Sequence, residues 1–145
     1  MNFQSKERML HIGDVYLMRF TGGNNEQNGW RPGLVFQNNT GNLYSPNIIA
    51  LPLTSSIKKV DQPTHVVIKA SDSGLRKDSM VLCENPERMS KNNIGQYITT
   101  LSDNYMKKIA IASVLATSII SYLDADVLLS AWKRSLTLNA IAVSA

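Results

Sequence analysis

The 145-residue sequence is poor in the residues that build covalent or metal-bound frameworks. A single cysteine, Cys83, excludes an internal disulfide and any multi-cysteine zinc cluster. The two histidines, His11 and His65, lack carboxylates at the spacings of a zinc-hydrolase site. The sequence also has no phosphate-binding loop, dinucleotide fingerprint or nucleophile elbow. It therefore gives no indication of metal-centred, nucleotide-binding or serine-hydrolase chemistry.

Long hydrophobic runs and a strong charge imbalance are missing as well. The longest nearly uncharged stretch, residues 109–123, includes several serines and threonines and is too short to span a bilayer. Residues 1–8 are polar and charged, without the apolar segment of a signal peptide. The net charge of +4 permits an acidic partner but does not identify one. We therefore expect a cytoplasmic protein with one core.

Short β-prone segments dominate the first hundred residues. Apolar runs separated by Gly- and Asn-rich turns predict strands at residues 15–20, 34–36, 48–51, 65–69 and 79–83. Residues 22–29 are predicted to form a loop, and residues 38–42 a turn. Several short strands at this spacing are typical of a small barrel or a strongly curved sheet.

The hydrophobic period changes after residue 100. Ser102 and Asp103 predict a helix start, and apolar residues then recur every three or four positions as far as Leu123. This pattern predicts an amphipathic helix packed on the sheet. The tail beyond it has an apolar cluster around Leu128, Leu129 and Trp132, which would be a liability in water. We expect the tail to fold as a second short helix, against either the barrel or a partner subunit.

The most informative candidate for function is Arg31, which precedes Pro32 beside the Gly-rich loop. The proline holds the arginine backbone extended, so that its guanidinium can meet a phosphate with two parallel hydrogen bonds. Taken alone, the pattern more often marks a solvated arginine at a hairpin end. The hydroxyl of Thr54, at the end of a predicted strand, can donate to a phosphoryl oxygen, although threonine is also an ordinary strand residue. His65 is interpreted as structural and Cys83 as a buried hydrophobe.

A series of motifs in the same order resembles the MazF/PemK toxin family. The resemblance runs from residue 13 to about residue 117. The matching segments are Gly13-Asp14-Val15, Glu26-Gln27-Asn28-Gly29-Trp30-Arg31-Pro32, Val35-Phe36-Gln37-Asn38, Asn42-Leu43-Tyr44-Ser45-Pro46, Ile48-Ile49-Ala50, Leu53-Thr54-Ser55, Pro63-Thr64-His65-Val66 and Gly74-Leu75-Arg76-Lys77-Asp78-Ser79.

The resemblance implies a mainly β (β+α) fold, a small SH3-like β-barrel with a C-terminal helix, which works as a homodimer. It further implies a sequence-specific endoribonuclease of a type II toxin–antitoxin system, which needs no metal or other cofactor. Its expected partners are single-stranded RNA and a cognate antitoxin. The family's catalytic residues fall on Arg31 and Thr54. Its RNA-contacting positions fall on Glu26, Gln27, Ser79 and Asn85, where Asn85 replaces the usual glutamine.

The sequence departs from the family in two places that bear on organisation. Pro86-Glu87-Arg88 replaces the usual Ile-Arg-Thr, and the chain continues past the family's normal end. We therefore expect residues 1–118 to form the toxin barrel with its helix, and residues 119–145 to form a helical extension packed on the same domain. The alternative functions are a non-catalytic module on the same fold, like the CcdB-type gyrase poisons, and a decayed toxin.

Overall fold

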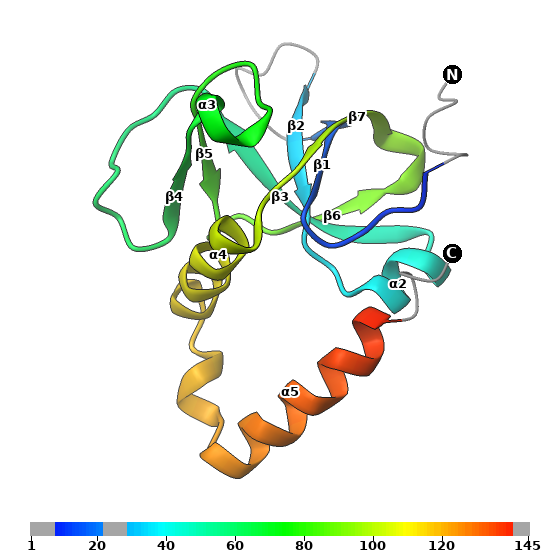
Figure 1. Cartoon of the computed structure of the whole chain (residues 1–145), viewed down its shortest axis with the longest axis vertical. Helices are drawn as coiled ribbons and strands as arrows, with labels where there is room; N and C mark the ends of the chain where they lie inside the picture. Colours follow the sequence, from blue (N-terminus) through cyan, green and yellow to red (C-terminus); the bar gives the residue numbers. More distant parts are fainter. Residues whose placement is uncertain (1–7, 22–28, 141–145) are drawn as a thin grey trace.

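Residues 8–21 and 29–140 are described by a computed structural model, in which a seven-stranded antiparallel sheet forms the body of the protein (Figure 1). The strands follow one another in the order β4-β5-β3-β2-β1-β7, and β6 pairs with β3. Their bounds are β1 (Asp14–Arg19), β2 (Trp30–Val35), β3 (Asn47–Thr54), β4 (His65–Ile68), β5 (Ser79–Leu82), β6 (Glu87–Ser90) and β7 (Ile94–Thr100). This arrangement confirms the predicted β+α class and the predicted strands that became β1 to β5.

Two hydrophobic clusters lie against the sheet, and alternate side chains of one strand enter different clusters. On β1, Val15 belongs to one cluster, whereas Tyr16 and Met18 belong to the other. On β3, Ala50 and Leu51 divide in the same way. This is the two-residue period expected of a strand that is covered on both faces. Burial in its cluster raises the pKa of Tyr16 to about 12.

The first cluster is closed by α4 (Asp103–Ala116), whose buried residues are Tyr105, Ile109 and Ala112. The helix begins as predicted, because the Ser102 side chain accepts a hydrogen bond from the Tyr105 N–H (3.4 Å). Its predicted end at Leu123 is wrong. The α-helix stops at Ala116, where the Thr117 hydroxyl accepts from the Ile119 N–H (3.4 Å), and residues Ile119–Tyr122 form the 3-10 helix η2. Hydroxyl side chains compete with the helical backbone in this way.

The segment predicted as an Asn-rich turn is instead a short helix, α2 (Asn39–Tyr44). Its N-cap is Asn38, whose side-chain oxygen accepts from the Gly41 N–H (2.9 Å). The same asparagine chemistry that favours turns therefore starts a helix here. Two further short elements are α3 (Ala70–Ser73) and the 3-10 helix η1 (Lys91–Asn93).

The chain ends in α5 (Ala125–Ala140), which extends away from the sheet and returns toward α2 (Figure 1). Within the described part of the chain, no helix is long and apolar enough to cross a membrane.

Candidate active site

A pocket of about 760 Å³ opens where β2 begins and β3 ends. It is bordered on the other sides by the segment after α3 and by β7. Three of the sequence-predicted site residues line it, Arg31, Thr54 and Ser79. Because β2 and β3 are antiparallel neighbours, the start of β2 and the end of β3 lie at the same end of the sheet.

Arg31 and Thr54 reach the pocket from two neighbouring antiparallel strands. The pairing of β2 with β3 joins Leu34 to Leu51 and Gly33 to Pro52. Arg31 and Thr54 lie two residues beyond the last of these pairs, each on its own strand, and both line the pocket. Two polar groups from different strands thus face one pocket.

The guanidinium of Arg31 packs against an aromatic ring. Its Cζ lies 5.0 Å from the ring centroid of Phe20, which is buried. A cation over an aromatic face is attracted by the ring quadrupole, so Phe20 helps to hold the Arg31 side chain in place. Gly33 leaves room for this ring, because a Cβ at that position would lie 2.8 Å from Phe20 Cζ and 2.5 Å from Met18 Sδ.

Thr54 is half-buried, and its hydroxyl has a defined role in the local backbone. Its Oγ1 accepts a hydrogen bond from the N–H of Ser56 (3.1 Å). Since that contact uses a lone pair and not the hydroxyl hydrogen, the hydrogen is available for donation to a group in the pocket.

Ser79 and a pair of cations complete the pocket. The Ser79 hydroxyl donates to the Lys77 carbonyl oxygen (3.0 Å), which leaves Ser79 Oγ able to accept. Arg76 and Lys77 are exposed and line the same pocket. Among the described residues that line it, none is acidic. The pocket therefore has the charge and the hydrogen-bond donors that suit a phosphate.

Of the other predicted site residues, Asn85 is not among those that line this pocket. Glu26 and Gln27 lie outside the described residues, in the segment that leads into β2. Asn85 follows the end of β5, whereas Ser79 begins that strand, so the two are at opposite ends of β5. The roles of Glu26, Gln27 and Asn85 remain predictions.

His65 has the structural environment that the sequence suggested. Its Nε2 lies 2.8 Å from Glu84 Oε2, and its Nδ1 lies 3.1 Å from the Lys59 carbonyl oxygen. Burial alone would raise the pKa of Glu84, but hydrogen bonds from its own backbone and from His65 hold that pKa below its usual value. Cys83 is buried, and burial raises its pKa to about 11, which suits an inert thiol. In the described segments, no three His, Cys, Asp or Glu side chains gather in a way that could hold a metal ion.

Sequence reasoning missed the contribution of β7 and of Phe20. Gln96 and Tyr97 of β7 line the pocket, although the polar sequence of that strand had not been predicted as a strand. Phe20 was predicted as a strand residue, but the contact with Arg31 depends on the pairing of β1 with β2. No local sequence signal marks either role.

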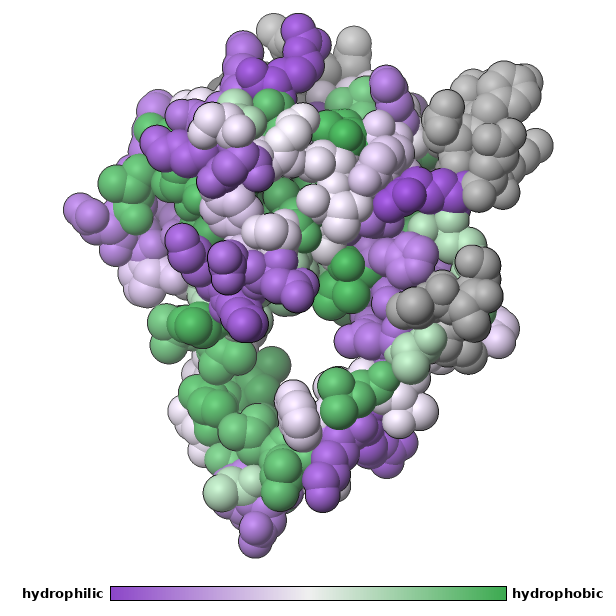
Figure 2. All heavy atoms as spheres, in the orientation of Figure 1, coloured by the Kyte–Doolittle hydropathy of each residue, from purple (hydrophilic) through white to green (hydrophobic). Residues whose placement is uncertain are grey.

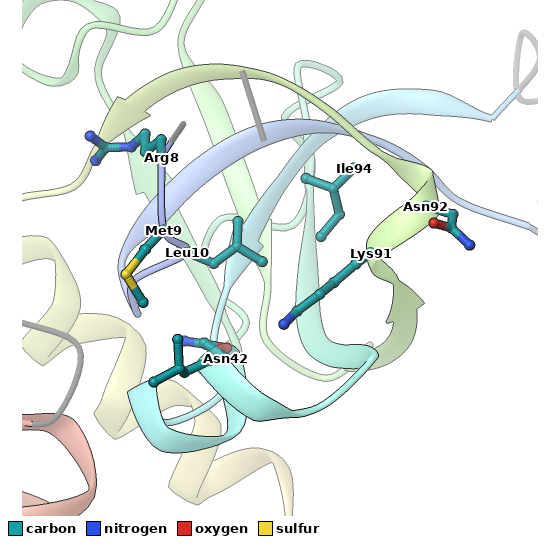
Figure 3. Close-up of a pocket in the computed structure, with 8 residues that line it drawn as sticks. Arg8, Met9, Leu10, Asn42, Lys91, Asn92 and Ile94 are labelled. Carbon is teal, nitrogen blue, oxygen red and sulfur yellow. The ribbon is translucent and has the colours of Figure 1, made fainter. Parts of the chain in front are cut away.

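A second, smaller pocket lies between the segment before β1, α2 and η1 (Figure 3). Its volume is about 310 Å³, and the ammonium of Lys91 extends into it toward Asn42 and Leu10. Burial lowers the pKa of Lys91. This pocket contains none of the sequence-predicted site residues.

Comparisons with known proteins agree on one family. Residues 11–116 match the family described as the PemK-like, MazF-like toxin of type II toxin–antitoxin system. The endoribonuclease MazF of Staphylococcus saprophyticus is 42% identical over 102 residues, which are 70% of this chain and 85% of that protein.

Solved structures give the same result for the fold. An endoribonuclease in complex with its cognate antitoxin, from a mycobacterial species, superimposes with a TM-score of 0.62 at 27% identity, covering 74% of this chain and 93% of that one. MazF from Deinococcus radiodurans superimposes with a TM-score of 0.63 at 19% identity, covering 79% and 98%. The family match ends at residue 116, the last residue of α4, so η2 and α5 lie beyond it.

Proposed function

Because this chain belongs to the family of PemK-like, MazF-like toxins of type II toxin–antitoxin systems, we propose that it cleaves single-stranded RNA at the pocket that holds Arg31 and Thr54. The toxin is an endoribonuclease, and a cognate antitoxin holds it silent. The cleavage needs no metal ion and leaves a 2′,3′-cyclic phosphate and a 5′-hydroxyl.

RNA carries its own nucleophile, which is why side chains alone are sufficient for this reaction. The 2′-hydroxyl oxygen attacks the adjacent phosphorus, a new bond forms between them, and the bond from phosphorus to the 5′ oxygen breaks. Negative charge builds on the non-bridging phosphoryl oxygens as the attack proceeds. A site that stabilises this charge with fixed donors lowers the barrier.

Arg31 and Thr54 supply those donors. The guanidinium of Arg31 offers two parallel N–H groups to the phosphoryl oxygens, and the Thr54 hydroxyl adds a third hydrogen bond. A guanidinium keeps its proton near neutral pH, so Arg31 acts by charge and geometry rather than as a base. Glu26 is the proposed acceptor of the 2′-hydroxyl proton, and the leaving 5′ oxygen takes up a proton as it departs.

The proposal extends to binding and location. Gln27, Ser79 and Asn85 contact the RNA, and the exposed cations Arg76 and Lys77 draw its backbone toward the pocket. The toxin works as a homodimer in the cytoplasm, where its RNA substrate is found.

The observation that carries this proposal is the pocket that Arg31 and Thr54 share. The two residues come from neighbouring strands, and the described lining of their pocket has cations and no carboxylate. A cationic lining attracts the anionic phosphodiester and repels a metal cation.

Purified protein incubated with a long RNA in excess EDTA tests the proposal. We expect cleavage by the wild-type chain and loss of most of it in Arg31→Lys, because lysine keeps the charge without the fork of donors. Arg19→Lys, at an exposed position on the neighbouring strand β1, is the matched control and should cleave normally. Intact RNA with the wild-type protein, or a strict requirement for magnesium, would refute the proposed function and would favour a non-catalytic toxin.

A further inference from the structure

The candidate active site is larger than a phosphate group requires. Its volume of about 760 Å³ is in the range of pockets that hold a small organic ligand, roughly 300–1,000 Å³. Besides the polar residues already described, its lining includes the apolar residues Leu17, Pro32, Leu53, Leu75 and Ile98. A nucleobase has apolar faces and a polar edge, so an apolar lining beside a phosphate site suits a base as well as its phosphate.

Gln96 of β7 is a polar side chain of this pocket to which the proposed reaction assigns no role. It lines the pocket and is exposed. Its side-chain amide has no hydrogen-bond partner among the described residues. The amide nitrogen donates and the amide oxygen accepts, which is the combination that proteins use to read a base edge. Because the amide is not engaged, it can make both bonds to a ligand without breaking one in the protein.

Gln96 lies at an irregularity in the pairing of β1 with β7. Residues 16 and 18 of β1 pair with residues 97 and 94 of β7. Only Leu17 lies between the two pairs on β1, whereas Gly95 and Gln96 both lie between them on β7. β7 is therefore bulged at this point, and bulges are frequent next to active sites, where they re-aim a side chain.

Close packing holds the bulge in place. A Cβ on Gly95 would lie 3.1 Å from the Leu17 carbonyl oxygen and 3.3 Å from Trp30 Cζ3. Both distances are shorter than an ordinary van der Waals contact, so glycine is what lets β7 approach β1 and the Trp30 ring this closely. The backbone that carries Gln96 is thus packed against β1 and β2, beside the strand that carries Arg31.

The exposed apolar side chains of the C-terminal part lie elsewhere. They gather over the outer part of α4, η2 and α5 (Figure 2), where Tyr122 and Trp132 are among the exposed residues. None of the exposed large hydrophobic residues beyond residue 110 lines the pocket. We therefore look for base recognition on the sheet and not on the tail.

We propose that Gln96 reads one base of the RNA, in a nucleotide next to the cleaved bond. This inference rests on the proposed function, in which Arg31 and Thr54 hold the phosphate in the same pocket. The base lies on the apolar lining, and the Gln96 amide donates to its edge and accepts from it. A bidentate contact of this kind changes the preference between bases by about 5- to 150-fold.

Mapping the cleaved bonds in a long RNA of mixed sequence tests the proposal. Sequencing of the new ends after digestion in EDTA gives the base preference at each position around the cut. Gln96→Met keeps the length of the side chain but removes its donor and acceptor. We expect it to lower the base preference at one fixed position by about 5-fold or more and to leave the other positions unchanged.

Gln96→Glu tests the direction of the contact. A carboxylate offers two acceptors, and guanine is the base whose edge carries two adjacent N–H donors, so the preference at the same position should shift toward guanine. The added negative charge opposes the phosphate and slows all cleavage, which is why preferences and not rates are compared. Asn104→Leu removes an exposed amide on α4, outside the pocket, and should leave every preference unchanged.

Wild-type preferences at every position in both Gln96 variants would overturn the proposal. If Gln96→Met then also resists the cognate antitoxin, the residue belongs to the antitoxin surface and not to base recognition.

Binding separates this inference from the proposed function. Short RNAs that differ in one base and carry 2′-O-methyl groups throughout cannot be cleaved, and their affinities are measured by fluorescence anisotropy. A base preference that the wild-type chain shows and Gln96→Met lacks would support the role of Gln96 even if the chain cleaved no RNA. Equal preferences in both chains would overturn that role even if the wild-type chain cleaved RNA normally.

Discussion

Replacing Thr54 by valine removes one hydroxyl from the proposed site and leaves the shape of the side chain almost unchanged. The structure separates two contributions of that hydroxyl. Its oxygen accepts a hydrogen bond from the exposed Ser56 N–H, and its hydrogen is available to the phosphoryl group. The first contribution is structural and the second is catalytic, so the effects of the substitution on stability and on rate can be calculated separately.

The structural effect should be small, because water can replace the acceptor at an exposed N–H; we expect a loss of less than about 1 kcal/mol in the free energy of unfolding. The catalytic effect should be larger. A hydrogen bond to a charged group is worth about 1.5–3 kcal/mol, which corresponds to a fall in kcat/KM of about 10- to 150-fold. Thr54→Ser keeps the hydroxyl and should recover most of the lost rate.

The assay follows cleavage of a short fluorogenic RNA in EDTA, with a urea denaturation curve recorded for each variant. If Thr54→Val cleaves within threefold of the wild-type rate, the hydroxyl does not stabilise the transition state. If Thr54→Ser is as impaired as Thr54→Val, the shape of the side chain, and not its hydroxyl, is what the site uses. Either result would refute the role given to Thr54.

The remaining predictions concern Arg31 and the core. Phe20→Leu should lower kcat more than it raises KM, because the guanidinium of Arg31 loses its aromatic support. Phe20→Tyr should keep most of the rate, and a Phe20→Tyr chain as slow as Phe20→Leu would argue against ring packing. Asp14→Asn should lower the unfolding free energy by about 1.5–3 kcal/mol in urea, since the fully buried Asp14 carboxylate accepts from the His11 N–H (3.0 Å) and the Thr100 hydroxyl (2.7 Å). Cys83 should resist alkylation at pH 8 in the folded chain and react on unfolding. Its pKa rises from 9.0 to about 11 on folding, so its contribution to stability is present below pH 9 and is lost as the pH rises through about 11. A Cys83→Ala chain with an unchanged stability profile between those pH values would contradict this.

Sequence patterns were sufficient to predict those parts of the fold in which burial and local chemistry act together. Apart from the exposed Ile49, the apolar residues of the runs that became β1 to β5 are half or fully buried, so their composition reflects their environment. The Arg31-Pro32 pair was visible for a similar reason, because a proline restricts its neighbour wherever it occurs. The resemblance to the family then assigned Arg31 and Thr54 to the same catalytic site, which no local signal in the sequence could do.

The remaining features depend on contacts between distant segments. β7 lies at the end of the sheet order and is only partly buried, so Gly95, Gln96 and the neighbouring polar residues carry no strong strand pattern. The end of α4 was missed because the apolar period continues past Thr117, whereas the backbone responds to the Thr117 hydroxyl. The exposed apolar face of α5 has the same sequence signature as a helix packed on a barrel, since periodicity does not identify what covers a helix.

The central claim is that the RNA supplies the nucleophile and the pocket supplies charge stabilisation. It is tested most directly by an RNA in which the nucleotide on the 5′ side of the cleaved bond carries hydrogen in place of its 2′-hydroxyl. In EDTA, the wild-type toxin should cut the all-RNA strand and leave a 2′,3′-cyclic phosphate, and it should leave the single-deoxy strand intact at that bond. Cleavage of the deoxy-substituted bond at a comparable rate would contradict the account, because the nucleophile would then have to come from water or from the protein.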